Sequence, residues 1–314
     1  MKYLSTFIIG FLCILLYSCN NKKNEPYTET MRSGVITVAM DESFQPVLQQ
    51  EIDVFEGINP QASVIPIYVN ETEALNLFLQ DSVRLAVTTR ALSEAEIASF
   101  NQRKLFPKAM VIATDGIALI INKENTDSLI TVNQLRSILT GETLTWQQLN
   151  GGSGSDSIQV VFDHPNSSSV RYALDSICKG APLSFDLFAQ KNNPSVIDFV
   201  ANHKNSLGII GVSWIGNKSD TTLMSFVDNI RVMSVSNAMN ATSQNSYKPY
   251  QAYIATKEYP LIRNIYALLN DPRGALPSGF FNFLTSDRGQ RIILKAGIVP
   301  ATQPIRIVST RDEL

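Results

Sequence analysis

The sequence predicts an α/β protein with two lobes, and three observations carry this prediction. Apolar, β-branched runs of strand length alternate with helix-periodic segments along most of the chain, as in βαβ units with helices on both faces of a mostly parallel sheet. Behind a leader-like N-terminus, a body of roughly 280 residues is long enough for a substantial core and two lobes. A hydrophobic content of 44% and a formal net charge of −2 fit a globular protein without a basic surface for nucleic acid.

The first part of the body reads as three strand–helix pairs. Strands are expected at residues 34–39, 64–69 and 84–88, which are rich in β-branched or apolar side chains. Helices are expected at residues 44–55 and 73–79, where apolar side chains recur with helical period. A third helix begins after Ser93, because Glu96 follows it at the spacing of a capping box.

The rest of the body continues this alternation. Two strands that run almost end to end, divided by Thr114 and Asp115, are expected at residues 108–113 and 116–122. Further strands are expected at residues 158–162, 207–212, 230–235, 251–255 and 264–269. Helices are expected at residues 131–139, 167–179, 195–203, 278–284 and 287–296. Gly208 and Gly211 are expected to permit close backbone packing of their strand.

The most informative segment follows directly after the expected strand 158–162. It contains Asp163 and then Ser167, Ser168 and Ser169 at the start of an expected helix. The first turn of a helix has unpaired N–H groups and a partial positive charge, so it can bind an anion, and three hydroxyl groups add further donors. The alternative is that one serine caps the helix and the others are incidental.

Residues 1–18 read as an export signal. Lys2 supplies the positive charge, and residues 4–16 form an apolar stretch that is too short for an ordinary membrane span. The segment Leu-Tyr-Ser-Cys ending at Cys19 resembles a bacterial lipobox, although Tyr17 replaces a smaller residue. The resemblance implies cleavage before Cys19, lipidation of its thiol, and a polar tether at residues 19–33; the alternative is ordinary secretion.

The remaining cysteine, Cys178, has no partner for a disulfide within a mature monomer. It falls on the apolar side of its expected helix, so we expect a small buried hydrophobic side chain. No second apolar run approaches the ~20 residues of a membrane-spanning helix.

Six segments stand in one order along nearly the whole mature chain. They are TTRALS at 88–93, IATDGIALIIN at 112–122, residues 135–146, LGIIG at 207–211, YPLIRNIY at 259–266 and residues 280–300. Together these segments resemble the phosphate-binding proteins of bacterial ABC importers, which have the type 2 periplasmic binding fold.

The resemblance implies two lobes that close on an oxyanion, with the chain crossing between them near residues 113–116 and 263–267. Lobe one then combines residues 34–112 with 268–314, and lobe two comprises residues 113–267. Proteins of this kind work by hinge closure around the ligand. We expect a monomer that delivers its anion to an ABC permease and stays attached to the membrane through lipid on Cys19.

The resemblance also implies ligand contacts from hydroxyl groups, with those of Thr88 and Thr89 among the expected donors. A hydroxyl–Phe pair of the family matches Ser43 and Phe44, and a Ser-Gly-Thr motif matches residues 167–169, with Ser168 in place of glycine. A serine of lobe one falls near Glu71 and Thr72, where Thr72 is the expected donor.

Two charged positions depart from the family pattern. Its phosphate-binding Arg is replaced by Asp163, and its proton-accepting Asp, at the end of the third strand beside Thr88, is replaced by Thr89. Our hypothesis is that Arg90 supplies the fork-shaped guanidinium instead, because Arg suits bidentate oxyanion contacts. Arg171 is a second candidate.

Asp163 would then accept a proton from the ligand or orient Arg90. In the alternative interpretation, Arg90 is solvated and Asp163 only caps the turn at Pro165.

The residues offer no pattern for catalysis or a cofactor. His164 and His203 lie far apart, without cysteines or an acidic cluster at the spacing of zinc ligands. There is no Gly-x-Ser-x-Gly elbow and no phosphate loop with Gly-Lys-Ser/Thr.

The prediction is therefore a lipid-anchored binder of phosphate or a close oxyanion in the bacterial cell envelope. The alternatives are a binder of another anion, and a surface or sensor lipoprotein that keeps the fold without phosphate transport.

Overall fold

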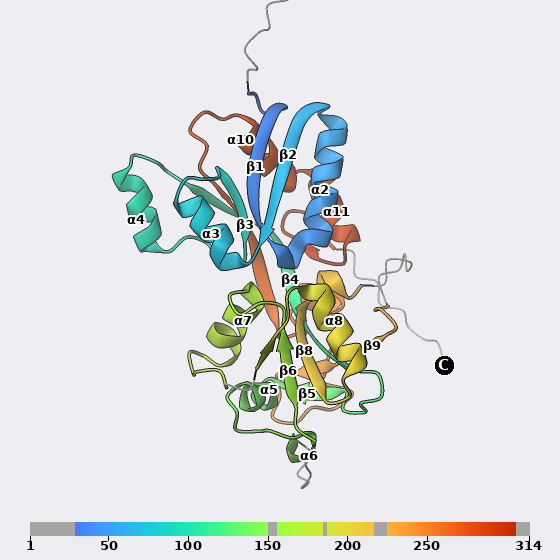
Figure 1. Cartoon of the computed structure of the whole chain (residues 1–314). Helices are drawn as coiled ribbons and strands as arrows, with labels where there is room; N and C mark the ends of the chain where they lie inside the picture. Colours follow the sequence, from blue (N-terminus) through green and yellow to red (C-terminus); the bar gives the residue numbers. More distant parts are fainter. Residues whose placement is uncertain (1–28, 150–155, 185–186, 217–224, 306–314) are drawn as a thin grey trace, which may run out of the picture.

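Two long strands tie the two halves of the molecule together (Figure 1). They are β4 (Lys108–Asn122) and β11 (Ile262–Leu269), which pair antiparallel. The computed structural model describes residues 29–149, 156–184, 187–216 and 225–305. The predicted signal, Cys19 and most of the predicted tether lie outside these residues.

The first half is a sheet with helices on both faces. Its strands run in the order β2 (Gln61–Val69), β1 (Ser33–Asp41), β3 (Leu85–Thr88), β11 and β4. One face packs against α2 (Gln45–Ile58), α10 (Leu276–Leu284) and α11 (Asp287–Lys295), and the other against α3 (Glu71–Leu79) and α4 (Glu94–Gln102). β1 pairs parallel with β2 and β3, whereas β11 is antiparallel to β3 and β4. The α/β class is therefore confirmed, with a mixed sheet.

The second half continues the sheet from the C-terminal part of β4. The order there is β4, β8 (Ser206–Gly211), β6 (Gln159–Phe162) and β7 (Phe188–Ala189), with β9 (Ile230–Val232) also paired to β4. A separate pair joins β5 (Leu129–Thr131) to β10 (Ser234–Ser236), and β12 (Val299–Pro300) pairs with β4. The helices are α5 (Val132–Leu139), α6 (Trp146–Leu149), α7 (Ser168–Tyr172), α8 (Asn193–Asn202) and α9 (Gln251–Ala255).

The continuous apolar run of β4 explains why the second half forms around it. Every side chain from residue 117 to residue 121 is buried, as expected for a strand covered on both faces. Gly208 lies beside this run because a Cβ there would lie 2.7 Å from Cγ1 of Ile120 and 2.8 Å from Cγ2 of Val200. The expectation that Gly208 permits close packing is thus confirmed.

Four expected elements differ from the structure. The strand expected at residues 230–235 is divided into β9, which pairs with β4, and β10, which pairs with β5. Residues 108–122 form one strand rather than two, because Asp115 stays in register opposite Arg263 of β11. Residues 251–255 are helix α9 rather than a strand, a distinction that a five-residue apolar run cannot decide. The helix expected at residues 167–179 changes after Tyr172 into a π-helical turn at Ala173–Ile177.

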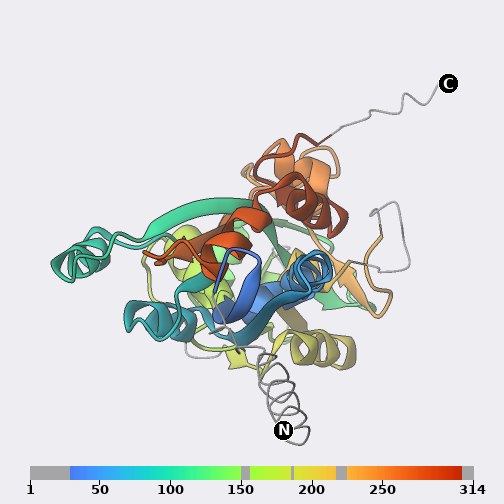
Figure 2. The same ribbon diagram turned by 90° about the horizontal axis from the view of Figure 1, so that it is seen from above.

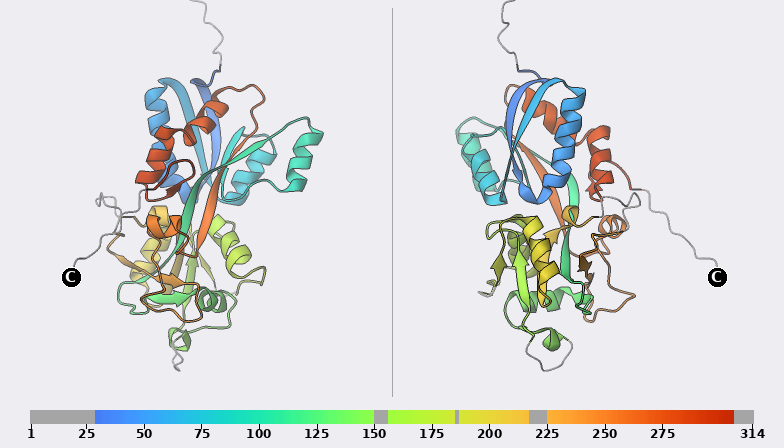
Figure 3. Two further views of the ribbon diagram at one scale, coloured as in Figure 1. Left: turned by 180° about the vertical axis from the view of Figure 1, so that it is seen from behind. Right: turned by 45° about the vertical axis from the view of Figure 1, so that its right-hand side comes forward.

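Seen from above, α4 stands out to one side of the first half, away from the other helices (Figure 2). From behind, β4 and β11 again run between the two halves (Figure 3). Cys178 is fully buried, as expected. Among the residues that the structure describes, no helix is long and apolar enough to cross a membrane.

Candidate functional site

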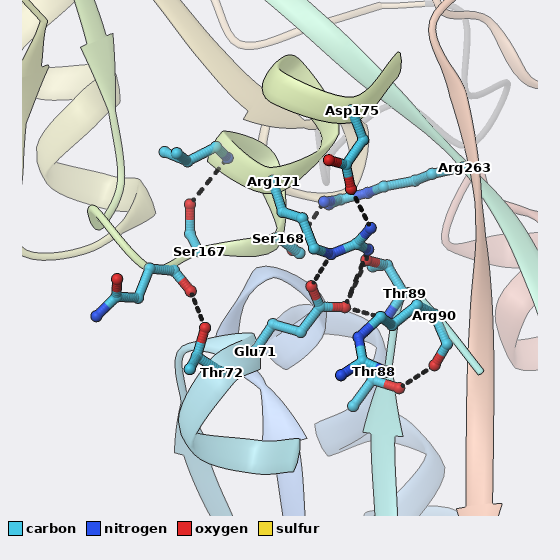
Figure 4. A network of polar contacts seen from close by, with 12 residues as sticks. Glu71, Thr72, Thr88, Thr89, Arg90, Ser167, Ser168, Arg171, Asp175 and Arg263 are labelled. Carbon is cyan, nitrogen blue, oxygen red and sulfur yellow. Dashed lines mark hydrogen bonds and ion pairs between the residues drawn. The ribbon is translucent and has the colours of Figure 1, made fainter. Parts of the chain in front are cut away.

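The candidate site lies where the two halves meet. The first half contributes the 3-10 turn η1 (Glu42–Phe44) after β1, the start of α3 and the end of β3. The second half contributes the start of α7, and Figure 4 shows how side chains from both halves approach one another. Sequence-distant hydroxyl and charged groups are thereby brought together in a buried place.

The three serines divide into a cap and two site residues. Ser167 caps α7, since its Oγ accepts a hydrogen bond from the N–H of Val170 at 3.3 Å. Ser168 Oγ lies 3.2 Å from Ser43 Oγ of the first half. Ser169 is completely buried, and its Oγ has no hydrogen-bond partner among the described residues. The cap interpretation is thus confirmed for Ser167, and anion binding by Ser168 and Ser169 stays a prediction.

Arg263 is the guanidinium that lies at the serines. Its Nη1 donates to Ser168 Oγ at 2.8 Å, and its Nε donates to Oδ2 of Asp115 at 3.0 Å. The guanidinium also lies over the ring of Phe44, 4.9 Å from its centroid, a favourable cation–π geometry. Only 6% of Arg263 is exposed, so the group is held rigidly and out of bulk water.

The structure places Arg90 away from this cluster, against our hypothesis. Its Nη1 and Nη2 each lie 2.8 Å from the carboxylate of Glu96, and about a third of its side chain is exposed. Asp163 does not contact it; instead Asp163 Oδ2 accepts from Nδ2 of Asn193 at 3.3 Å. The neighbouring Thr88 hydroxyl donates to the carbonyl of Arg90 at 2.8 Å. The correction is that Arg263, rather than Arg90, supplies the guanidinium at the serines.

Two buried carboxyl groups flank Arg263. Asp41 Oδ1 accepts from the N–H of Ser43 at 3.0 Å, while burial raises the pKa of Asp41 to about 6 although Arg263 opposes the shift. Burial also raises the pKa of Asp163, against the lowering effect of the Ser167 hydroxyl. Asp41 Oδ2 and Asp163 Oδ1 have no hydrogen-bond partner among the described residues. These oxygens can therefore accept protons or hydrogen bonds from a ligand.

Glu42 extends the acidic side of the site. Burial, followed by the charges of Asp163 and Asp41, raises its pKa to about 7. The charges of Asp163 and Asp41 thus disfavour ionisation of Glu42.

A second cluster is centred on Glu71, which is 2% exposed. The backbone N–H and the hydroxyl of Thr89 each donate to Oε1 of Glu71 at 2.6 Å. Arg171 donates from Nε to Oε2 of Glu71 at 2.5 Å and from Nη2 to the Thr89 hydroxyl at 2.5 Å (Figure 4). Burial alone would raise the pKa of Glu71, but its bonds and charge interaction with Arg171, together with the Thr89 donors, lower it. Glu71 therefore remains ionised at neutral pH.

Thr72, expected as a ligand donor, instead contacts the second half. Its hydroxyl donates to the carbonyl of Asn166 at 3.3 Å, and its residue is exposed. The backbone carbonyl of Ser43 also bonds to the second half. It accepts hydrogen bonds from Nε1 of Trp214 at 2.8 Å and from the hydroxyl of Ser213 at 3.1 Å.

Sequence reasoning missed Arg263, Asp115, Asp41 and Glu71. A signal was available for the first two, because both lie in the segments expected to cross between the lobes, 263–267 and 113–116. A polar pair on the two strands that cross between the halves must lie at the junction of the halves (the waist). Asp41 and Glu71 carried no such signal.

Two further observations bound the chemistry. Among the described residues, no group of three His, Cys, Asp or Glu side chains is arranged to hold a metal ion. A cavity of about 500 Å³ lies elsewhere, at the other end of β1, with Arg84 and Arg273 in its lining. It holds none of the expected contacts, so we place the site at the waist.

Comparison with known proteins identifies the family of the chain. A family model described as PBP superfamily domain matches residues 25–288. The phosphate-binding protein PstS of Borreliella burgdorferi is 25% identical over 309 residues, which cover 95% of this chain and 99% of the relative. PstS of Bacillus subtilis is 22% identical over 283 residues, which cover 87% and 83%.

Solved structures agree in fold. A putative phosphate ABC transporter substrate-binding protein from Clostridium perfringens, with bound phosphate, superposes with a TM-score of 0.69 at 20% identity, covering 85% of this chain and all of the other. An ABC-type phosphate transport receptor from Vibrio cholerae gives a TM-score of 0.65 at 20% identity with the same coverage. The chain therefore belongs to the PBP superfamily, and its resemblance to the phosphate-binding proteins of ABC importers is confirmed.

Proposed function

We propose that this chain is a solute-binding protein that captures inorganic phosphate between its two halves and delivers it to an ABC importer, without catalysis. The observation that carries the proposal is the buried cluster of Arg263, Ser168, Ser43 and the unpartnered Ser169 hydroxyl. A buried polar group without a partner is costly in a native structure, and a ligand that bonds to it removes that cost.

The chemistry of the cluster suits an anion that still carries protons. Arg263 and the hydroxyl groups can donate to phosphate oxygens, whereas Asp41 and Asp163 can accept from P–OH groups. Sulfate has no proton to offer at neutral pH and would face these carboxylates unpaired. We therefore expect a preference for phosphate over sulfate, and we assign to Asp41 and Asp163 the acceptor role that Asp has in the family.

The named relatives point the same way. The two curated relatives described above are named phosphate-binding protein PstS, and this chain aligns with nearly their whole length. We extend their named ligand to this chain, and we expect its partner to be an ABC permease.

We further propose that the two halves are the closing lobes, with bounds at residues 34–112 plus 268–314 and at residues 113–267. The crossing strands β4 and β11 would contain the hinge, and closure would bring the Ser43 turn onto Ser168. Of the earlier ligand contacts, we retain Ser43, Phe44, Ser168, Ser169 and Asp163, and we replace Arg90 with Arg263.

We propose that the protein is exported and held at the cell envelope by lipid on Cys19, with a short polar tether before β1. Mass spectrometry of the membrane-extracted protein tests this directly. A diacylglyceryl group on Cys19 is expected, and an unmodified thiol would contradict the anchor.

The function is tested by calorimetric titration of residues 20–314 with phosphate and with sulfate, in phosphate-free buffer. Phosphate is expected to bind at submicromolar concentration and sulfate at least tenfold more weakly. The Ser169→Ala variant should lose roughly 10- to 150-fold in affinity, because a hydrogen bond to a charged group contributes about 1.5–3 kcal/mol and about 1.4 kcal/mol corresponds to a tenfold change. Ser99→Ala, at an exposed position of α4, is the matched control. No heat with either anion would favour a surface or sensor protein that has lost the ligand.

A further inference from the structure

Glu71 has the coordination of a bound oxyanion. Its carboxylate accepts from a backbone N–H, a hydroxyl and a guanidinium, which are the three kinds of donor that proteins use for phosphate and carboxylate groups. In a fold built to close on an anion, this donor set is therefore already occupied by a side chain of the protein itself.

The contact spans the gap between the halves. Glu71 begins α3 and Thr89 follows β3, both in the first half, whereas Arg171 lies in α7 of the second half. Figure 4 shows the guanidinium of Arg171 reaching across to the carboxylate and the Thr89 hydroxyl. Glu71 thus joins the same two halves that a ligand at the serines would join, through α3 and β3 rather than through η1 and β11.

The carboxylate of this pair is buried, so losing its cation is costly. Glu71 is 2% exposed, whereas about a third of the Arg171 side chain is exposed and Arg171 keeps a second partner, Asp175, at 3.3 Å. Removing one partner of a buried ion pair leaves an uncompensated charge, so the closed arrangement depends on both.

Each arginine near the site has a carboxylate partner, Asp115 in the case of Arg263, but they differ in their contact with the serines. Arg171 is neutralised by Glu71, and Arg90 by Glu96 on its own half. Of the three arginines discussed here, Arg263 alone contacts a serine of the α7 start. A ligand that recruited Arg171 would first have to displace Glu71.

We propose that Glu71 is a resident anion that latches the two halves together through Arg171 and Thr89 and withdraws both from the ligand. The two halves are then held together before a ligand binds. An oxyanion that binds beside Arg263 therefore does not have to supply the full free energy of closure. The latch itself stands on the contacts above; its effect on the ligand rests on the proposed phosphate binding.

Small-angle X-ray scattering of the purified protein in phosphate-free buffer tests the latch. The wild type should have the compact radius of gyration calculated from this structure, and phosphate should leave it unchanged. Glu71→Ala should show a larger radius, and Glu71→Gln an intermediate one, because the amide keeps the Thr89 bonds but loses the ion pair. Arg171→Gln removes the partner in the second half, so its radius of gyration should equal that of Glu71→Ala.

Glu73→Gln is the matched control, since Glu73 lies two residues further along the same helix and is exposed. If Glu71→Ala and Arg171→Gln keep the wild-type radius, or if the wild type is open until phosphate is added, the latch is refuted. Calorimetry on the same samples separates the two proposals. If the variants open but the wild type does not bind phosphate, the latch is supported and the proposed function is overturned. If the wild type binds phosphate but the variants do not open, the function is supported and the latch is overturned.

Discussion

Replacing Arg263 with Gln should damage both the stability of the protein and its binding of phosphate, for two separable reasons. The guanidinium pairs with Asp115, with Nε and Nη2 each 3.0 Å from Oδ2. Asp115 is completely buried, so the variant leaves a carboxylate in the interior without its cation. Breaking a buried pair in this way costs about 3–5 kcal/mol.

The double variant Arg263→Gln with Asp115→Asn separates these reasons. It removes the orphaned charge together with its partner, so most of the lost unfolding free energy should return, leaving a deficit of about 1–2 kcal/mol for the lost bond to Ser168 and the lost contact with Phe44. Phosphate affinity should not return, because the ligand still lacks the guanidinium. Both variants should bind phosphate at least tenfold more weakly than the wild type.

Urea unfolding in phosphate-free buffer and calorimetric titration measure the two effects. Arg90→Gln is the matched control, since its ion pair with Glu96 is partly exposed and such pairs contribute about 0.2–1 kcal/mol. If the double variant is as unstable as the single one, the pairing with Asp115 does not explain the loss. If the double variant binds phosphate like the wild type, Arg263 is not a ligand contact.

Three further outcomes follow from the contacts. Glu51 is fully buried, neither carboxylate oxygen has a hydrogen-bond partner within the described part of the chain, and burial raises its pKa to about 9. A raised pKa means that stability is lost as pH rises, so Glu51→Gln should stabilise the protein by about 3 kcal/mol at pH 7 and hardly at pH 4.5 in urea unfolding. An equal gain at both pH values would contradict this. Arg90→Ala should change phosphate affinity less than threefold by calorimetry, and a tenfold loss would return Arg90 to the site. Gly208→Ala should lower the unfolding free energy by about 1–3 kcal/mol, because its Cβ would lie 2.7 Å from Ile120; an unchanged melting temperature would show that Ile120 repacks freely.

Local patterns were sufficient to predict much of the fold. The alternation of strand and helix periods placed most elements, and the Ser93–Glu96 capping box exists as predicted. The serine turn after β6 was likewise predictable, because a strand, a turn and a helix cap each leave a local signature. Errors arose where tertiary pairing overrides local sequence, as in β4, which continues through Asp115 because Arg263 lies opposite.

The site was predicted only in part, for a physical reason. Ser168 and Ser169 were expected from the local strand–turn–helix pattern and Ser43 from the family resemblance, and all three lie at the waist. Arg90 was expected at the site because it is next to Thr89 in sequence. Sequence proximity does not decide which carboxylate a guanidinium pairs with, and in the structure Arg90 pairs with Glu96. Long side chains reach partners that are set by the fold, so the only sequence signal for Arg263 was its place in a segment expected to cross between the lobes.

The most direct test of the account is to locate a bound anion in a crystal. Arsenate has the shape and the protons of phosphate, and its anomalous scattering identifies its position without interpretation. We predict one strong peak within hydrogen-bond distance of the Arg263 guanidinium and the Ser169 hydroxyl. A peak instead in the cavity beside Arg84 and Arg273, with none at the waist, would contradict the site proposed here.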